Sequence, residues 1–149
     1  GRIEPIPTNV LWIAAINNGA QFTGTTTVDP AQLDRFAPLR VDYPPQAEEV
    51  RLLRMRFPSL PQSRVETIVR AANAVRTSEN LGLDMSMRAT EEACVLLSHP
   101  NFANMGPECL EDILKDTFCA RVPGRVDDDA TDAGMMWRVV SDSLKGAKR

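Results

Sequence analysis

Three polar residues of this sequence have side chains suited to phosphate chemistry. Asn17 follows an apolar run, Arg35 stands near the end of a short predicted helix, and Arg88 lies in the first turn of another. An amide at the carboxyl end of a parallel strand lies where such sheets bind ligands, and it can orient a water near a terminal phosphate. A guanidinium stays charged and binds phosphate oxygens in a fixed fork. These three residues are therefore the candidate site.

Each candidate also has a purely structural interpretation. Asn17, or its neighbour Asn18, can close a turn in a loop. Arg35 can pair on the surface with Asp34 or with a carboxylate of the helical region. Arg88 can be an exposed helical arginine, although a cation in the first turn opposes the helix dipole, a cost that a bound phosphate would offset.

The motifs that ATP hydrolysis needs are missing from the sequence. A phosphate loop reads G-x-x-x-x-G-K-[ST], and the run from Gly24 to Thr27 lacks the lysine. No apolar strand ends in Asp-Glu to hold magnesium. The chain is therefore not expected to hydrolyse ATP alone.

Metal sites are also not expected. The single His99 and the odd set of cysteines (Cys94, Cys109 and Cys119) fit no zinc spacing, which favours buried free thiols. The run from Asp127 to Asp129 lacks the further ligands of a calcium loop, and it favours a loop with Asp129 as a helix cap.

Composition is that of one globular domain, or of a small domain with an appendage. The chain has 149 residues, 43% of them hydrophobic, a net charge of -3 and a pI of about 5.2. This acidic balance argues against nucleic-acid binding through bulk positive charge. No apolar run reaches the length of a membrane span and no secretory signal is visible, so we expect a cytoplasmic protein. Because Gly1 is not Met, the true start is expected elsewhere.

The first 45 residues predict a mixed α/β fragment. Residues 10–16 form a continuous apolar run, typical of a strand buried on both faces. A loop rich in Asn, Gly and Thr follows, then a short helix over residues 29–36 and a second strand over 39–43. Strand, helix and strand with short links indicate a parallel arrangement, which is incomplete because two strands make a poor sheet alone.

Residues 46–149 predict an all-helical domain. Apolar residues at helical spacing indicate five helices, over residues 46–55, 63–77, 86–98, 107–121 and 130–144. Ser63 and Glu66 have capping-box spacing at the start of the second. The expected fold class is therefore mixed α/β but mostly α, with a partial parallel sheet before a helical domain.

Four motifs in this order resemble the AAA+ ATPases of the MoxR-like branch, including the cobaltochelatase-subunit type. Residues 9–17 (NVLWIAAIN) resemble the strand that ends in the first sensor, and 33–36 (LDRF) the helix with the arginine finger. Residues 41–45 (VDYPP) resemble the exit into the lid, and 85–89 (MSMRA) the lid helix that begins with the second sensor. The resemblance is strongest over residues 9–54 and 81–97.

The resemblance implies a role for each candidate residue. Asn17 would be the first sensor, Arg35 would complete the nucleotide site of the next subunit in a homo-oligomeric ring, and Arg88 would couple nucleotide state to lid angle. ATP and Mg²⁺ would bind the full-length protein, while this chain, as a piece of it, would bind neither tightly.

The family further implies a partner protein as client, with a metal-insertion or maturation role, often beside a von Willebrand A-type protein. Two alternatives stay open. One is a non-hydrolysing helical interaction module derived from an AAA+ protein, and the other is a helical adaptor whose β segment is incidental.

Overall fold

The computed structural model describes residues 9–11, 13–16, 31, 34–79, 81, 85–103 and 105–146. The chain divides into two compact units, Gly1–Val41 and Asp42–Arg149. The helices with assigned bounds all lie in the second unit. Asn17 and Asn18 lie outside the described residues.

The predicted parallel sheet fragment is wrong, because no strand occurs in the part of the chain that the structure describes. Leu11 and Ile13, in the apolar run, are 82% and 85% exposed, and Leu39 in the second predicted strand is 86% exposed. A strand must pair its backbone groups with a neighbour and cover its apolar faces. Neither segment is assigned as a strand among the described residues, and the three apolar side chains named above stay exposed. Of the predicted helix at 29–36, the structure describes Ala31 as helical and residues 34 and 35 as a turn.

The second unit is built from helices alone, as far as it is described. Its five longer helices overlap the five predicted ones, and α6 runs on into a 3-10 turn, η1, which completes the predicted range. A further short helix, α5, was not predicted. The elements are α2 (Gln46–Arg56), α3 (Gln62–Arg76), α4 (Met87–Ser98), α5 (Pro100–Ala103), α6 (Pro107–Phe118), η1 (Cys119–Arg121) and α7 (Asp132–Lys145).

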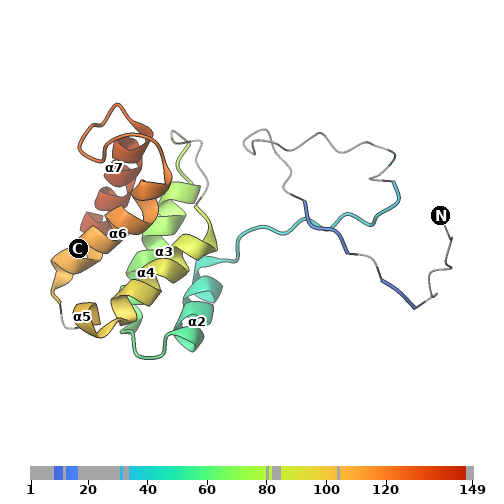
Figure 1. Ribbon diagram of the computed structural model, residues 1–149, viewed down its shortest axis with the longest axis horizontal. Helices are drawn as coiled ribbons and strands as arrows, with labels where there is room; N and C mark the ends of the chain where they lie inside the picture. Colours follow the sequence, from blue (N-terminus) through green and yellow to red (C-terminus); the bar gives the residue numbers. More distant parts are fainter. Residues whose placement is uncertain are drawn as a thin grey trace, which may run out of the picture. The chain divides into compact units, whose positions relative to one another are not determined.

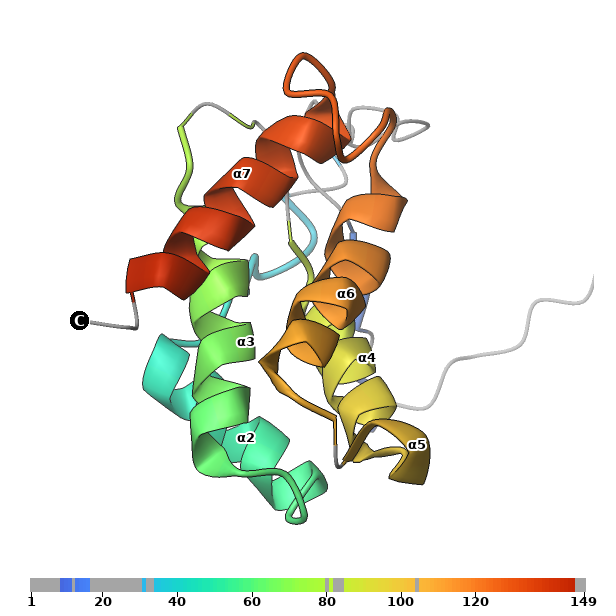
Figure 2. The same cartoon turned by 90° about the vertical axis from the view of Figure 1, so that its left-hand side faces the viewer.

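Helix α3 is the centre of this unit. It packs against α2, α4 and α7, and α4 packs in turn against α6 (Figures 1 and 2). Its buried apolar residues recur at three- and four-residue intervals, which is the spacing of one helical face. They are Val65, Ile68, Val69, Ala71, Ala72 and Val75, and all have 0% exposure.

Two predicted helix caps are wrong. Helix α3 begins one residue before Ser63, after Pro61, whose fixed backbone angle starts the helix without a side-chain cap. Helix α7 begins after Thr131 and not after Asp129, because the Thr131 hydroxyl accepts a hydrogen bond from the Gly134 amide at 3.1 Å. The loop before α7 thus extends two residues further than the run of aspartates suggests.

Gly134 is where this loop lies against α7. A Cβ placed on Gly134 would stand 2.0 Å from the carbonyl oxygen of Asp128, which is a backbone atom and cannot rotate away. Alanine at a helical position usually gains up to about 1 kcal/mol over glycine. We expect Gly134→Ala instead to lower the free energy of unfolding by about 1–3 kcal/mol, because the loop must move.

Urea denaturation followed by circular dichroism measures this change. The matched control is Gly146→Ala at the other end of α7, where a Cβ meets nothing within 4 Å. It should leave the stability unchanged or raise it slightly. Equal effects of the two substitutions would show that the close approach to Asp128 carries no cost.

Candidate functional site

Arg88 lies on the exposed side of α4, at its second residue. The N-cap residue Ser86 has extended backbone angles, and its side chain makes no capping hydrogen bond. The first backbone amides of a helix have no partners within the helix, so this end carries partial positive charge. The Arg88 guanidinium adds a full charge at the same end. The first turn of α4 is therefore suited to an anion such as a phosphate group.

The carboxylates nearest to Arg88 in its own helix are held by arginines from elsewhere. Glu91 and Glu92, three and four residues on, would ordinarily pair with it. Instead Glu91 pairs with Arg56 of α2 at 2.5 Å, and Glu92 pairs with Arg121 of η1. Within the described residues Arg88 itself forms no ion pair, and it lines a shallow hollow with Glu91, Glu92 and Val95.

Beneath this surface, a buried ion pair joins α2 to α3. The Arg76 guanidinium donates to both oxygens of Glu49, at 2.6 and 3.2 Å. The Glu49 side chain is 0% exposed and that of Arg76 is 7% exposed. Such a forked pair fixes both distance and orientation.

The same pair reaches the beginning of α4. Arg76 Nε donates to the Met85 carbonyl at 2.7 Å. The buried Thr90 hydroxyl lies 2.8 Å from Glu49 Oε1 and 2.8 Å from the Met87 carbonyl, so its one proton serves one of these acceptors or is shared between them. Three helices therefore meet in one set of hydrogen bonds.

The aromatic ring of Tyr43 completes this cluster. The Arg76 guanidinium carbon stands 4.3 Å from the ring centroid, a cation–π distance. Tyr43 belongs to residues 42–45, which we name the lead-in segment because it leads into α2. The lead-in segment thus contacts the buried ion pair directly.

The structure does not show the other two predicted site residues, Asn17 and Arg35, together with Arg88. Arg35 is exposed and belongs to the first unit, whereas Arg88 belongs to the second. Asn17 lies outside the described residues. The roles assigned to Asn17, Arg35 and Arg88 stay predictions. Sequence reasoning missed Glu49 and Arg76 altogether, although both fall on the apolar stripes of their helices.

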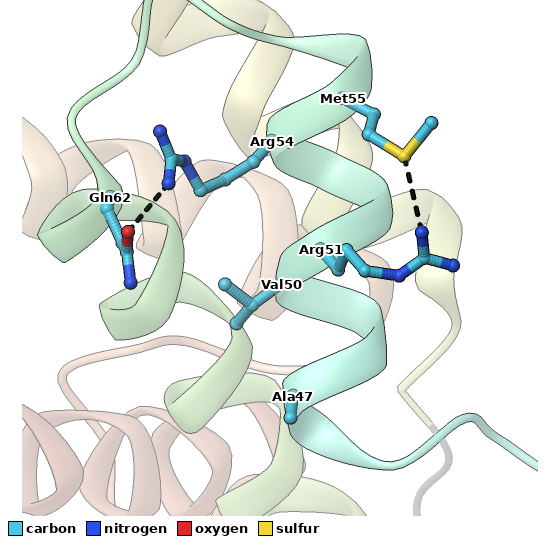
Figure 3. Close-up of a pocket in the computed structure, with 6 residues that line it drawn as sticks. All are labelled: Ala47, Val50, Arg51, Arg54, Met55 and Gln62. Carbon is cyan, nitrogen blue, oxygen red and sulfur yellow. Dashed lines mark hydrogen bonds between the residues drawn. The ribbon is translucent and has the colours of Figure 1, made fainter.

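A second shallow hollow lies on the outer side of α2 (Figure 3). The Arg54 guanidinium donates to the side-chain oxygen of Gln62 at 2.6 Å, and Arg51 forms a forked pair with Glu48, which lowers the pKa of that carboxyl. Met55, beside these arginines, is 69% exposed. This side of α2 combines cationic and apolar groups.

No metal site is found within the described ranges, where no three His, Cys, Asp or Glu side chains gather closely enough to hold an ion. The cysteines Cys94, Cys109 and Cys119 are free and buried. Burial raises the pKa of Cys94 to about 12, with smaller contributions from the charges of Glu49 and Glu91. Burial likewise raises the pKa of Cys119 to about 11, against a lowering effect of Lys115.

Because burial raises the pKa values of these thiols, we expect the free energy of unfolding to fall at alkaline pH. An unfolded cysteine ionises near 9.0, whereas Cys94 in the folded chain keeps its proton until about 12. The stability is therefore complete below pH 9.0 and falls as pH rises between these values, by at most about 1.4 kcal/mol per pH unit for each thiol. Urea midpoints across this range should fall less steeply for Cys94→Ala than for the unchanged chain. Parallel curves would contradict the assignment.

No helix in the described part of the chain combines the length and the apolar composition that a membrane crossing requires. In comparisons with known proteins, no family model and no solved structure matches the chain. A Thauera aromatica protein named "Putative chaperone BssE" is 33% identical to it over 81 residues. These residues are 54% of this chain and 28% of that protein, so the chain spans little more than a quarter of its relative. A distant, partial relative of this chain is thus named as a chaperone.

Proposed function

We propose that this chain is part of an ATP-dependent chaperone of the AAA+ class, in which the helical unit is the lid and Arg88 contacts the bound nucleotide. The observation that carries the proposal is the exposed Arg88 at the start of α4, whose neighbouring carboxylates are engaged by Arg56 and Arg121. The name of the Thauera aromatica relative supports a chaperone role. The proposal adds ATP to that role on the strength of the phosphate-compatible helix end.

In this proposal, ATP hydrolysis drives remodelling or maturation of a client protein by a ring of identical subunits. Arg88 contributes a charge-assisted contact to the terminal phosphates, and Arg35 contributes to the site of the adjacent subunit. The described residues hold no acidic cluster for Mg²⁺. The proposal assigns the groups that hold the magnesium and most of the triphosphate to other parts of the full-length protein.

The first test is to sequence the coding DNA upstream of Gly1 and to express the native protein that it encodes. A phosphate loop followed by a strand ending in Asp-Glu is the expected result. A start codon immediately before Gly1 would overturn the ATPase proposal. Submillimolar ATP binding by the 149-residue chain alone would also contradict it, because most phosphate contacts are placed elsewhere.

The second test is Arg88→Ala in the native protein. A hydrogen bond to a charged group contributes about 1.5–3 kcal/mol, so the Kd for a non-hydrolysable ATP analogue should rise about tenfold or more. Arg125→Ala is the control, because Arg125 is exposed and pairs only with Asp127 among the described residues. Titration calorimetry on both variants decides the point. An unchanged Kd in Arg88→Ala would remove Arg88 from the nucleotide site.

The outer side of α2 favours one other function, that of an interaction module without hydrolysis. Met55 is 69% exposed beside Arg51 and Arg54, a surface suited to an acidic amphipathic segment of a partner. ATP dependence distinguishes the interaction module from the ATP-dependent chaperone. An interaction module would bind its partner equally well with and without ATP, and Arg88→Ala would leave that binding unchanged.

A further inference from the structure

We propose that the buried Glu49–Arg76 pair positions Arg88 for nucleotide binding, by fixing the first turn of α4 to α2, α3 and the lead-in segment. The inference rests on the proposed function, since it assumes that Arg88 contacts a phosphate. Glu49 and Arg76 are positioning residues and touch no ligand themselves, because both are buried.

The hydrogen bonds of the pair bracket Arg88 in the sequence. Arg76 holds the Met85 carbonyl, three residues before Arg88, and Glu49 holds the Thr90 hydroxyl, two residues after it. Thr90 is buried while Arg88 is exposed, so the two side chains lie on opposite sides of the helix. The network therefore holds the buried side of the first turn of α4, and Arg88 lies on the exposed side of the same turn.

Stability alone does not account for a charged pair at this place. Burying two charges carries a desolvation cost, and apolar residues of similar volume often serve a core equally well or better. An apolar pair cannot supply directional contacts that fix the orientation of α4. The guanidinium and carboxylate together make five short contacts with fixed geometry, two between themselves and three with Met85, Thr90 and Tyr43.

Tyr43 gives the network a link to the chain before α2. Its ring lies on the Arg76 guanidinium, so a displacement of the lead-in segment acts on the group that holds the Met85 carbonyl. The same cluster thus connects the lead-in segment to the angle at which α4 presents Arg88.

The test is a double-mutant cycle in the native protein, with binding of a non-hydrolysable ATP analogue as the readout. The paired variant Glu49→Leu/Arg76→Met replaces both charges by apolar groups, and Thr90→Val removes only the hydroxyl link to Glu49. Each is combined with Arg88→Ala, and each is first shown to be folded by its circular dichroism and melting temperature. If the paired variant fails to fold, Thr90→Val carries the test.

The expected result is loss of coupling. Arg88→Ala should raise the Kd about tenfold in the unchanged background but less than about twofold in the paired variant. Thr90→Val should raise the Kd in the same direction by a smaller factor. Tyr43→Ala, which removes the ring from the Arg76 guanidinium, should also weaken binding.

Two different failures are distinguishable. If Arg88→Ala changes nothing in the unchanged background, the proposed function is wrong at Arg88 and the inference falls with it. If Arg88→Ala costs about tenfold in both backgrounds, Arg88 binds nucleotide but the buried pair does not position it, and only the inference is overturned.

Discussion

Removing the Glu49 carboxylate alone should destabilise the helical unit severely. The Arg76 side chain is 7% exposed. Glu49→Leu therefore leaves its guanidinium without an anionic partner and with little access to water. Breaking a buried pair in this way costs about 3–5 kcal/mol, because the remaining charge is uncompensated. The paired variant Glu49→Leu/Arg76→Met should recover most of that loss, since neither charge is then buried.

Urea unfolding of the 149-residue chain measures these differences. The matched control is Glu48→Leu, at the neighbouring position of α2, where an exposed carboxylate pairs with Arg51. An exposed pair contributes about 0–1 kcal/mol, so this control should change little. Additive losses in the paired variant would contradict the account, because they would mean that Glu49 and Arg76 act separately.

Under the proposed function, Arg35→Ala should abolish most ATP hydrolysis by the native protein while sparing ATP binding. An arginine supplied by one subunit to the site of another stabilises the charge of the transferring phosphoryl group, and it contributes about 10³–10⁵ in kcat. We therefore expect kcat to fall by at least about 10³-fold, with the Kd of a non-hydrolysable analogue unchanged.

The measurement is a steady-state phosphate-release assay with two controls. Arg35→Lys keeps the charge without the planar fork and should remain impaired. A protein with Arg35→Ala, mixed with subunits that carry an inactivated nucleotide site but an intact Arg35, should regain activity. Equal kcat values for Arg35→Ala and the unchanged protein would return Arg35 to the role of a surface arginine.

The helices were predictable because their signal is local. Val65, Val69 and Ala72 recur at the spacing of one helical face, and the structure buries all three in α3. The ends were harder, because Pro61 and Thr131 determine where α3 and α7 begin, and neither stands where the sequence patterns place a cap. Helix α5 was missed since its four residues are too short to show a period.

The strand prediction failed for a different reason. An apolar run such as residues 10–16 indicates that the segment is suited to burial, but a strand exists only where another strand pairs with it. Ile13 is 85% exposed, so the described part of the chain supplies no cover. Sequence reasoning thus assigned a buried strand to an apolar segment that the described residues leave exposed and without a strand partner.

The buried pair was missed because charged residues are expected outside. Two signals were nevertheless present. Glu49 lies four residues before the buried Leu53, and Arg76 lies four residues after the buried Ala72, so each charge interrupts an apolar stripe. Two opposite charges in such positions on consecutive helices indicate a buried partner for each.

The ion pairs Arg56–Glu91 and Arg121–Glu92 should make the residues at these positions change together among related sequences. A natural sequence that loses Arg56 or Arg121 returns a carboxylate to α4, where it stands three or four residues from Arg88 and can neutralise it. Each loss is mild for the fold, since both pairs are at least partly exposed to solvent. Among homologous sequences that keep Arg88, arginine at 56 and 121 should therefore accompany glutamate at 91 and 92, and these positions should be exchanged as pairs.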